Sequence, residues 1–442
     1  MKDPHGDDPV IHHEVYTLPN GLQVILVPDQ RVPLVAVSVW YHVGSGSENH
    51  GKSGFAHLFE HMLFQGSKNV GSDRHFEILR KIGASNVNGT TNSDRTNYFE
   101  VVPSNELPTA LWLESDRMSH LLPLLTEESF RNQVDVVRNE RRQRYDNVPY
   151  GKARFALAAA LFPEGHPYRY LTIGRHEDLE RASLADVTAF YKTWYVPANA
   201  TLAIGGDFDV VTAKKLVDRW FGGFPPSEKP KLVAVPPPPA RAGAVTVNDD
   251  FAKLRLLQFA WLSPGNFQPG DAELDLLASA LGDEGTGRLY RILVFEKQLA
   301  QAVSVSQSGA GFSGTFNVTV SLRSEADAEA VKRIVTEEVA RLGREPLSNG
   351  ELRRGIIGYE SAAVYGLEDL LSRVERLQTY NHYLGSPDRL SWDLDRYRST
   401  SFDKLRDVAA QFLTPARMTV VTTLPSSPSS PSSAPAAGKA KP

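Results

Sequence analysis

The sequence predicts an α+β fold in which two similar halves each form a mixed sheet with helices. Runs of β-branched and aromatic residues alternate with segments of helical periodicity along most of the 442 residues. This alternation occurs twice, once on each side of a proline-rich stretch. The two halves can also be superposed in sequence, with residues 57–63 over 275–281 and 98–102 over 316–320. We therefore expect a duplicated fold of two homologous domains.

The first half opens with strand patterns and continues with helices. A Pro-Asn-Gly turn at residues 19–21 lies between strand patterns at 14–17 and 22–28, which predicts a hairpin. A long strand pattern at 32–43 is followed by a loop rich in glycine and serine and by a helix that begins near Gly54. Beyond it we expect a helix around 73–81, with His75 at the surface, strands at 97–102 and 199–204, and helices at 107–122, 126–144, 152–163, 177–194 and 211–220.

The second half resumes the same alternation of strand and helix patterns. The predicted segments are 254–261, 272–281, 316–322, 326–342, 349–371 and 417–423. We divide the chain into a flexible N-terminus (1–13), a first domain (14–224), a proline-rich linker (225–245), a homologous second domain (246–424) and a tail (425–442). The tail is of low complexity and has too few apolar residues to form a core.

Composition and charge exclude several classes of protein. The 48 basic and 52 acidic residues give a formal charge of −4, so charge offers no case for nucleic acid as the main partner. The absence of cysteine excludes disulfide frameworks, thiolate metal sites and cysteine nucleophiles. No apolar run is long enough to predict a membrane span. The polar start predicts a cytoplasmic protein or, if a signal peptide was trimmed, a periplasmic or secreted one.

The segment GFAHLFEHMLFQGS at 54–67 carries the clearest chemical signal. It holds His57, Glu60 and His61 in an H-x-x-E-H arrangement, and these positions share one face of a helix. Two neutral imidazoles one turn apart can bind one Zn²⁺, and a carboxylate beside them can take a proton from a zinc-bound water. This spacing is the inverted zincin signature.

A catalytic zinc site needs a third protein ligand and an open fourth position. Glu140 is the best candidate, because it lies on a predicted helix with an apolar face. Glu114, Glu127 and Glu128 are rivals that spacing alone leaves open.

The second half keeps the apolar spacing of the motif and loses its chemistry. His57 is replaced by Asp275, Glu60 by Ala278 and His61 by Ser279. Ala362 falls at the position of Glu140. Packing alone therefore does not require the motif, and we expect the second domain not to bind metal.

With these motifs, the sequence resembles the pitrilysin/insulysin family of inverzincin metallopeptidases. It is most similar to short bacterial processing-peptidase-like members and to subunits of the mitochondrial processing peptidase. The likeness spans nearly residues 14–424. Its markers are LPNGLQVILV (18–27), GFAHLFEHMLFQGS (54–67), VVRNERRQ (136–143), HPYRYLTIG (166–174) and WYVPANATLAIGGDFD (194–209). The resemblance implies two homologous α/β domains that form half of a clamshell.

The resemblance also implies roles for individual residues. Zn²⁺ would be bound by His57, His61 and Glu140, with Glu60 as the general base. The implied activity is that of a zinc metalloendopeptidase that hydrolyses internal bonds of unfolded peptides.

A peptide-pairing edge strand is implied at Asn88, Gly89 and Thr90, where an extended substrate would add by backbone hydrogen bonds. The residues alone favour an ordinary polar loop there.

Two positions depart from the family pattern. Gln133 stands where members often carry an acidic residue before the ligand glutamate. Active members also hold the substrate with an Arg and a Tyr from the second domain, and residues 314–324 offer only Arg323. We therefore expect a dimer, and specifically a heterodimer if a homologous subunit supplies the Arg/Tyr pair. The alternative is a non-catalytic or partner-dependent peptide-binding subunit of a processing-peptidase-like complex.

Overall fold

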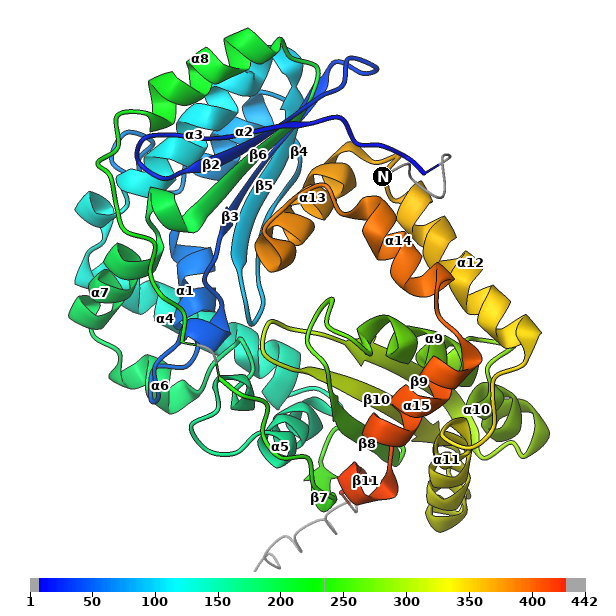
Figure 1. Cartoon of the computed structure of the whole chain (residues 1–442). Helices are drawn as coiled ribbons and strands as arrows, with labels where there is room; N and C mark the ends of the chain where they lie inside the picture. Colours follow the sequence, from blue (N-terminus) through cyan, green and yellow to red (C-terminus); the bar gives the residue numbers. More distant parts are fainter. Residues whose placement is uncertain (1–7, 234, 427–442) are drawn as a thin grey trace, which may run out of the picture.

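Two mixed sheets form the framework of the molecule, which confirms the predicted α+β fold class (Figure 1). The computed structural model describes residues 8–233 and 235–426. The first sheet has the order β1-β2-β6-β3-β5-β4 and the second has the order β7-β11-β8-β10-β9. The strands are β1 (Glu14–Thr17), β2 (Gln23–Pro28), β3 (Leu34–Tyr41), β4 (Ser85–Thr91), β5 (Thr96–Pro103), β6 (Ala200–Gly206), β7 (Gly243–Asp249), β8 (Leu256–Ser263), β9 (Ala300–Ser308), β10 (Gly314–Leu322) and β11 (Thr419–Pro425).

Apart from β1, the two sheets share one design. The central strand is β3 in the first sheet and β8 in the second. On one side of it lie two antiparallel neighbours, β5 and β4 or β10 and β9, and on the other side lies a parallel pair, β6 and β2 or β11 and β7. The helices are α1 (Phe55–Met62), α2 (His75–Lys81), α3 (Leu107–Ser119), α4 (Glu127–Arg141), α5 (Gly151–Leu161), α6 (His176–Arg181), α7 (Leu184–Trp194), α8 (Val210–Phe221), α9 (Asp271–Gly282), α10 (Arg288–Tyr290), α11 (Ala328–Leu342), α12 (Asn349–Tyr365), α13 (Leu370–Leu384), α14 (Leu390–Arg398) and α15 (Phe402–Phe412).

Both faces of the first sheet are buried, because alternate residues of each strand point to opposite faces. Val24 and Leu26 face the main core with α1 and α3, whereas Ile25 and Val27 face α13. Helix α13 comes from the second half of the chain, and yet it packs against the sheet of the first half (Figure 1).

Several helix boundaries differ from the prediction. The single helix expected at 177–194 is two helices, because Ser183 caps α7 through a reciprocal capping box with Asp186. The helix expected at 349–371 ends at Tyr365. Strands β7 and β9 and helices α13 to α15 were not predicted as elements, and β4 was expected only at residues 88–90, from the family resemblance. Among the described residues, no helix is both long and apolar enough to cross a membrane.

Candidate metal centre

Helix α1 begins at a close contact between two glycine backbones. Gly54 and Gly174 both have positive φ angles, of 94° and 73°, and a Cβ on Gly174 would lie 2.5 Å from the Cα of Gly54. The first amides of the helix are satisfied by Glu48, whose carboxylate accepts hydrogen bonds from Gly54 N at 2.9 Å and Ala56 N at 2.8 Å. Burial raises the pKa of Glu48 to about 8, with the amides of the helix start opposing that shift. A carboxyl group from the preceding loop therefore caps α1.

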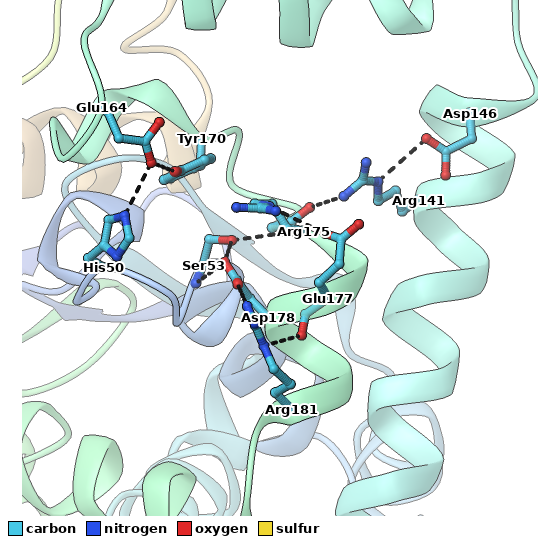
Figure 2. A network of polar contacts seen from close by, with 11 residues as sticks. His50, Ser53, Arg141, Asp146, Glu164, Tyr170, Arg175, Glu177, Asp178 and Arg181 are labelled. Atoms are coloured by element: carbon cyan, nitrogen blue, oxygen red, sulfur yellow. Dashed lines mark hydrogen bonds and ion pairs between the residues drawn. The ribbon is translucent and has the colours of Figure 1, made fainter.

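A polar network supports the same end of α1 (Figure 2). Asp178 of α6 accepts the Ser53 hydroxyl at 2.6 Å, and the Ser53 oxygen accepts the amide of Arg175 at 3.0 Å. Arg141, at the end of α4, donates to the carbonyl of Gly174 at 2.7 Å. The loop before α1 is thereby tied to α6 and to the helix that carries Glu140. The Arg141 side chain is therefore a structural contact between α4 and the loop that packs on the start of α1.

The apolar side of α1 fixes which way the motif faces. Phe55, Leu58, Phe59 and Met62 are buried in the main core, and the Tyr98 hydroxyl donates to the carbonyl of Phe59 at 3.0 Å. The remaining face of the helix carries the two histidines and the glutamate of the motif towards α4 and β4.

His57, His61 and Glu140 come together as one set of donor atoms. The Oε2 atom of Glu140 lies 3.6 Å from His57 Nε2 and 3.1 Å from His61 Nε2. A tetrahedral ion with bonds of about 2 Å would hold its ligand atoms about 3.3 Å apart. The three side chains are between 11% and 26% exposed, so the donors are sheltered and still reachable. Two imidazoles and one carboxylate at this spacing fit a zinc ion with an open position.

The electrostatics of the set favour the forms of these residues that bind metal. Burial lowers the pKa of His57 to about 4, reinforced by His61 and Arg144 and opposed by Glu140, so the ring is neutral at physiological pH. Burial acts to raise the pKa of Glu140. The hydrogen bond with His61 and the charges of both histidines and Arg144 outweigh it, so the pKa of Glu140 is lowered.

Glu60 lies beside this set in a different environment. Burial raises its pKa, against the opposing effects of a hydrogen bond from Thr91 and the charge of His61. The Thr91 hydroxyl donates to Glu60 Oε2 at 2.6 Å. Thr91 was not among the residues predicted for the site, and its sequence position before the expected strand gave no signal of the contact.

Asn88, Gly89 and Thr90 lie on β4, at the edge of the first sheet. Together with the metal-site residues they line a cavity of about 730 Å³. The polar segment is thus an edge strand, whereas the residues alone favoured a loop. Its pairing with β5 is irregular between Ser85 and Asn88 and regular from Asn88 to Thr91.

The three rival glutamates lie elsewhere. Glu127 and Glu128 occupy the first turn of α4, more than two turns from Glu140. Glu114 is fully buried on α3, where it pairs with Arg117 at 2.5 Å.

Glu114 belongs to a second group of potential ligands, with His75 and Glu100. All three are buried, which corrects the expectation that His75 lies at the surface. The guanidinium of Arg117 occupies this group, donating to Glu114 and contacting His75 Nε2 at 2.5 Å. Burial raises the pKa of Glu100, and the adjacent Glu114 adds to that effect. The Arg117 cation already offsets negative charge in this group, and the raised pKa of Glu100 favours its neutral form, so the group does not fit a further divalent ion.

Two family models match the chain, one for each half. Residues 23–163 match the model described as "Insulinase (Peptidase family M16)", and residues 181–359 match "Peptidase M16 inactive domain". The first match contains the metal-site residues, and the second covers most of the half that lacks them.

Relatives match along most of their length. The "Zinc protease PqqE" of Helicobacter pylori is 29% identical over 82% of each chain, and the "Uncharacterized zinc protease YmxG" of Bacillus subtilis is 23% identical over 90% of this chain and 95% of its own. The crystal structure of a protease from Helicobacter pylori superposes with a TM-score of 0.87 at 26% identity, covering 94% of this chain and all of that one. The chain belongs to the M16 peptidase (insulinase/pitrilysin) family.

Proposed function

We propose that the chain is a zinc metalloendopeptidase that hydrolyses internal bonds of unfolded peptides. The observation that carries the proposal is the set formed by His57, His61 and Glu140, with the Glu60 carboxylate beside it and an edge strand across the same cavity. The names of relatives as zinc proteases support the choice of metal and of reaction.

The proposed mechanism divides the work between these residues. Zinc bound by His57, His61 and Glu140 would act as a Lewis acid, polarising the scissile carbonyl and lowering the pKa of a water molecule. Glu60 receives the proton of the attacking water and later passes it to the leaving amine. Because its Oε2 atom already accepts the Thr91 proton at 2.6 Å, we assign the transfer to Oε1.

The proposed substrate is an extended peptide segment. The outer edge of β4 can pair with it through backbone hydrogen bonds. This pairing places a peptide bond near His57, His61 and Glu140 and does not require a particular side chain at every position of the peptide. Asn88, Gly89 and Thr90 are the proposed pairing positions. An unfolded chain meets this requirement, whereas a folded protein would have to release a strand first.

Replacement of the base tests the function. Glu60→Gln should retain one zinc per chain, because Glu60 is not among the proposed ligands, and should lose hydrolysis of an unfolded peptide by about 10²- to 10⁴-fold. Zinc content by atomic emission and turnover of a quenched fluorescent peptide check the two halves of the expectation. A variant that still cleaves at the wild-type rate would show that Glu60 is not the base.

The partner-dependent alternative rests on the missing Arg/Tyr pair. Arg323 follows β10, and its Nε contacts the carbonyl of Ala300 within its own domain at 3.4 Å. We therefore propose a dimer, or a heterodimer with a homologous subunit that supplies the pair. Native mass measurement with a peptidase assay tests this point, and a fully active monomer would contradict it.

A further inference from the structure

The environment of Glu60 is set mainly by strand β4. Thr91 is the last residue of that strand, and its Oγ1 atom lies 2.6 Å from Glu60 Oε2. The Thr91 Oγ1 atom is also 3.3 Å from the hydroxyl oxygen of Thr96, and the Thr96 hydroxyl donates to the carbonyl of Val43 at 2.9 Å. The Thr96 oxygen could also accept the Thr91 proton, but the carboxylate of Glu60 is the nearer acceptor, at 2.6 Å against 3.3 Å, so the Thr91 proton is directed to Glu60.

A second feature of β4 restricts the same side chain. A Cβ on Gly89 would lie 3.2 Å from Glu60 Cγ and 2.9 Å from a ring carbon of Phe64. The backbone of the strand therefore packs directly on the aliphatic part of Glu60, while Thr91 fixes its carboxylate. Neither contact involves His57, His61 or Glu140.

We propose that Thr91 is a positioning residue for Glu60. Its hydroxyl holds Oε2 so that Oε1 faces the attacking water, and it does so from the strand that is proposed to pair with the peptide. The inference rests on the proposed function, in which Glu60 is the base. A carboxylate free to rotate would spend much of its time away from the reactive geometry, and misplacement by about 1 Å can cost about 100-fold in rate.

The test compares isosteric and conservative variants. Thr91→Val keeps the branched shape that suits a strand and removes the hydroxyl, so kcat for a quenched fluorescent peptide should fall about 10- to 100-fold while KM stays near the wild-type value. Thr91→Ser restores the hydroxyl and should recover most of the kcat. Thr109→Val is the matched control, because it removes a threonine-to-glutamate hydrogen bond of 2.8 Å to Glu106, away from the cavity. It should leave kcat unchanged.

Two readouts are independent of turnover. Zinc content should be the same in the wild type and both Thr91 variants. Crystal structures of the metal-free proteins should show the Glu60 carboxylate fixed in the wild type and in Thr91→Ser, and rotated or spread over several rotamers in Thr91→Val. A fixed Glu60 in the valine variant would overturn the proposal.

The kinetic outcomes are equally decisive. Wild-type kcat in Thr91→Val, a loss confined to KM, or equal losses in the valine and serine variants would each overturn the positioning role. Failure of the proposed function has a different signature, in which the wild type and Glu60→Gln show the same peptide turnover. In that case the crystal structures still decide whether Thr91 positions Glu60.

Discussion

At the scale of single residues, Glu140 divides its two oxygens between different partners. Oε2 faces both histidines, at 3.1 and 3.6 Å, and Oε1 accepts from Arg144 at 2.9 Å. Arg144 lies one turn further along the chain and is 73% exposed, so its ion pair adds little to stability. It nevertheless favours the orientation in which Oε2 points at the histidines.

Removing Glu140 should therefore release the metal. Glu140→Ala takes away one of the three proposed ligands, and we expect zinc affinity to fall more than about 100-fold, beyond the effect of a residue that only supports a ligand. Glu128→Ala is the matched control on the same helix and should bind zinc like the wild type. Competition with a fluorescent zinc chelator measures both affinities. Equal affinities in the wild type and Glu140→Ala would exclude Glu140 as a ligand.

At this scale, prediction from sequence worked where geometry is local. The spacing of His57, Glu60 and His61 fixes their common face, because all three lie on one helix. The choice of Glu140 over its rivals depends on how α4 crosses α1, which spacing does not contain. Burial of His75 depends likewise on Arg117, which is distant in sequence and enters the core with its charge compensated.

At the scale of elements, α13 joins the two halves. Leu370, Val374 and Leu377 pack on the face of the first sheet that lies opposite α1 and α3. Gly205 of β6 leaves room there for Val374. Polar residues share the same surface. Glu375 accepts from Asn97 at 2.8 Å and from Trp40, and Gln378 donates to the backbone of β3 and β6.

The polar face explains why α13 was not predicted. A helix that buries Gln378 and Asn381 and partly buries Glu375 does not show the apolar stripe by which surface helices are recognised. The residues alone favoured a loop at β4 for a related reason, since this strand is polar and pairs on one side only. By contrast, central strands such as β3 have continuous apolar runs and were predicted close to their observed bounds.

Two histidines make the docking of α13 sensitive to pH. His42 at the end of β3 and His382 of α13 approach to 2.7 Å between their Nδ1 atoms, so one must donate and the other accept. Protonation of both would place two protons in that contact. Burial lowers the pKa of His382 to about 4, with Asp94 opposing and Arg95 and Lys229 reinforcing the shift. Burial and the neighbouring His382 also lower the pKa of His42.

Stability should consequently fall as pH drops from about 6.5 towards 4. In this window the unfolded chain binds protons that the folded chain excludes, so the stability present above pH 6.5 is lost on acidification. The slope is at most about 1.4 kcal/mol per pH unit for each histidine. His382→Gln should flatten the dependence, and the exposed His12→Gln should not. Urea midpoints at pH 7 and pH 5 measure the difference, and an unchanged pH dependence in His382→Gln would argue against the pair.

At the scale of the whole molecule, the two halves exchange corresponding helices. Helix α5 follows α4 as α13 follows α12. The same register that sets Glu140 over Ala362 sets residues 125–130, at the start of α4, over 347–352, at the start of α12. Each of the two helices packs against the sheet of the other half: α13 on β3 and β6, and α5 on β7, β8 and β11 (Figure 1). Duplication could be predicted from the repeat, but this reciprocal packing could not, because a repeat in sequence is equally compatible with two self-contained domains.

Reciprocal packing implies that the linker is not what holds the halves together. Its exposed Lys231 lies within residues 225–233, which are described without helix or strand. Cutting the chain at a specific protease site inserted after Lys231 should leave two fragments that co-elute in gel filtration. Val374→Asp, which places an unpaired charge where the wild-type residue is fully buried, should cost about 3–5 kcal/mol and separate the cut fragments. Ser372→Asp puts the same charge at an exposed position in the first turn of α13 and should leave them associated. Separation of the wild-type fragments after cutting would show that the covalent linker, and not the exchanged helices, maintains the arrangement.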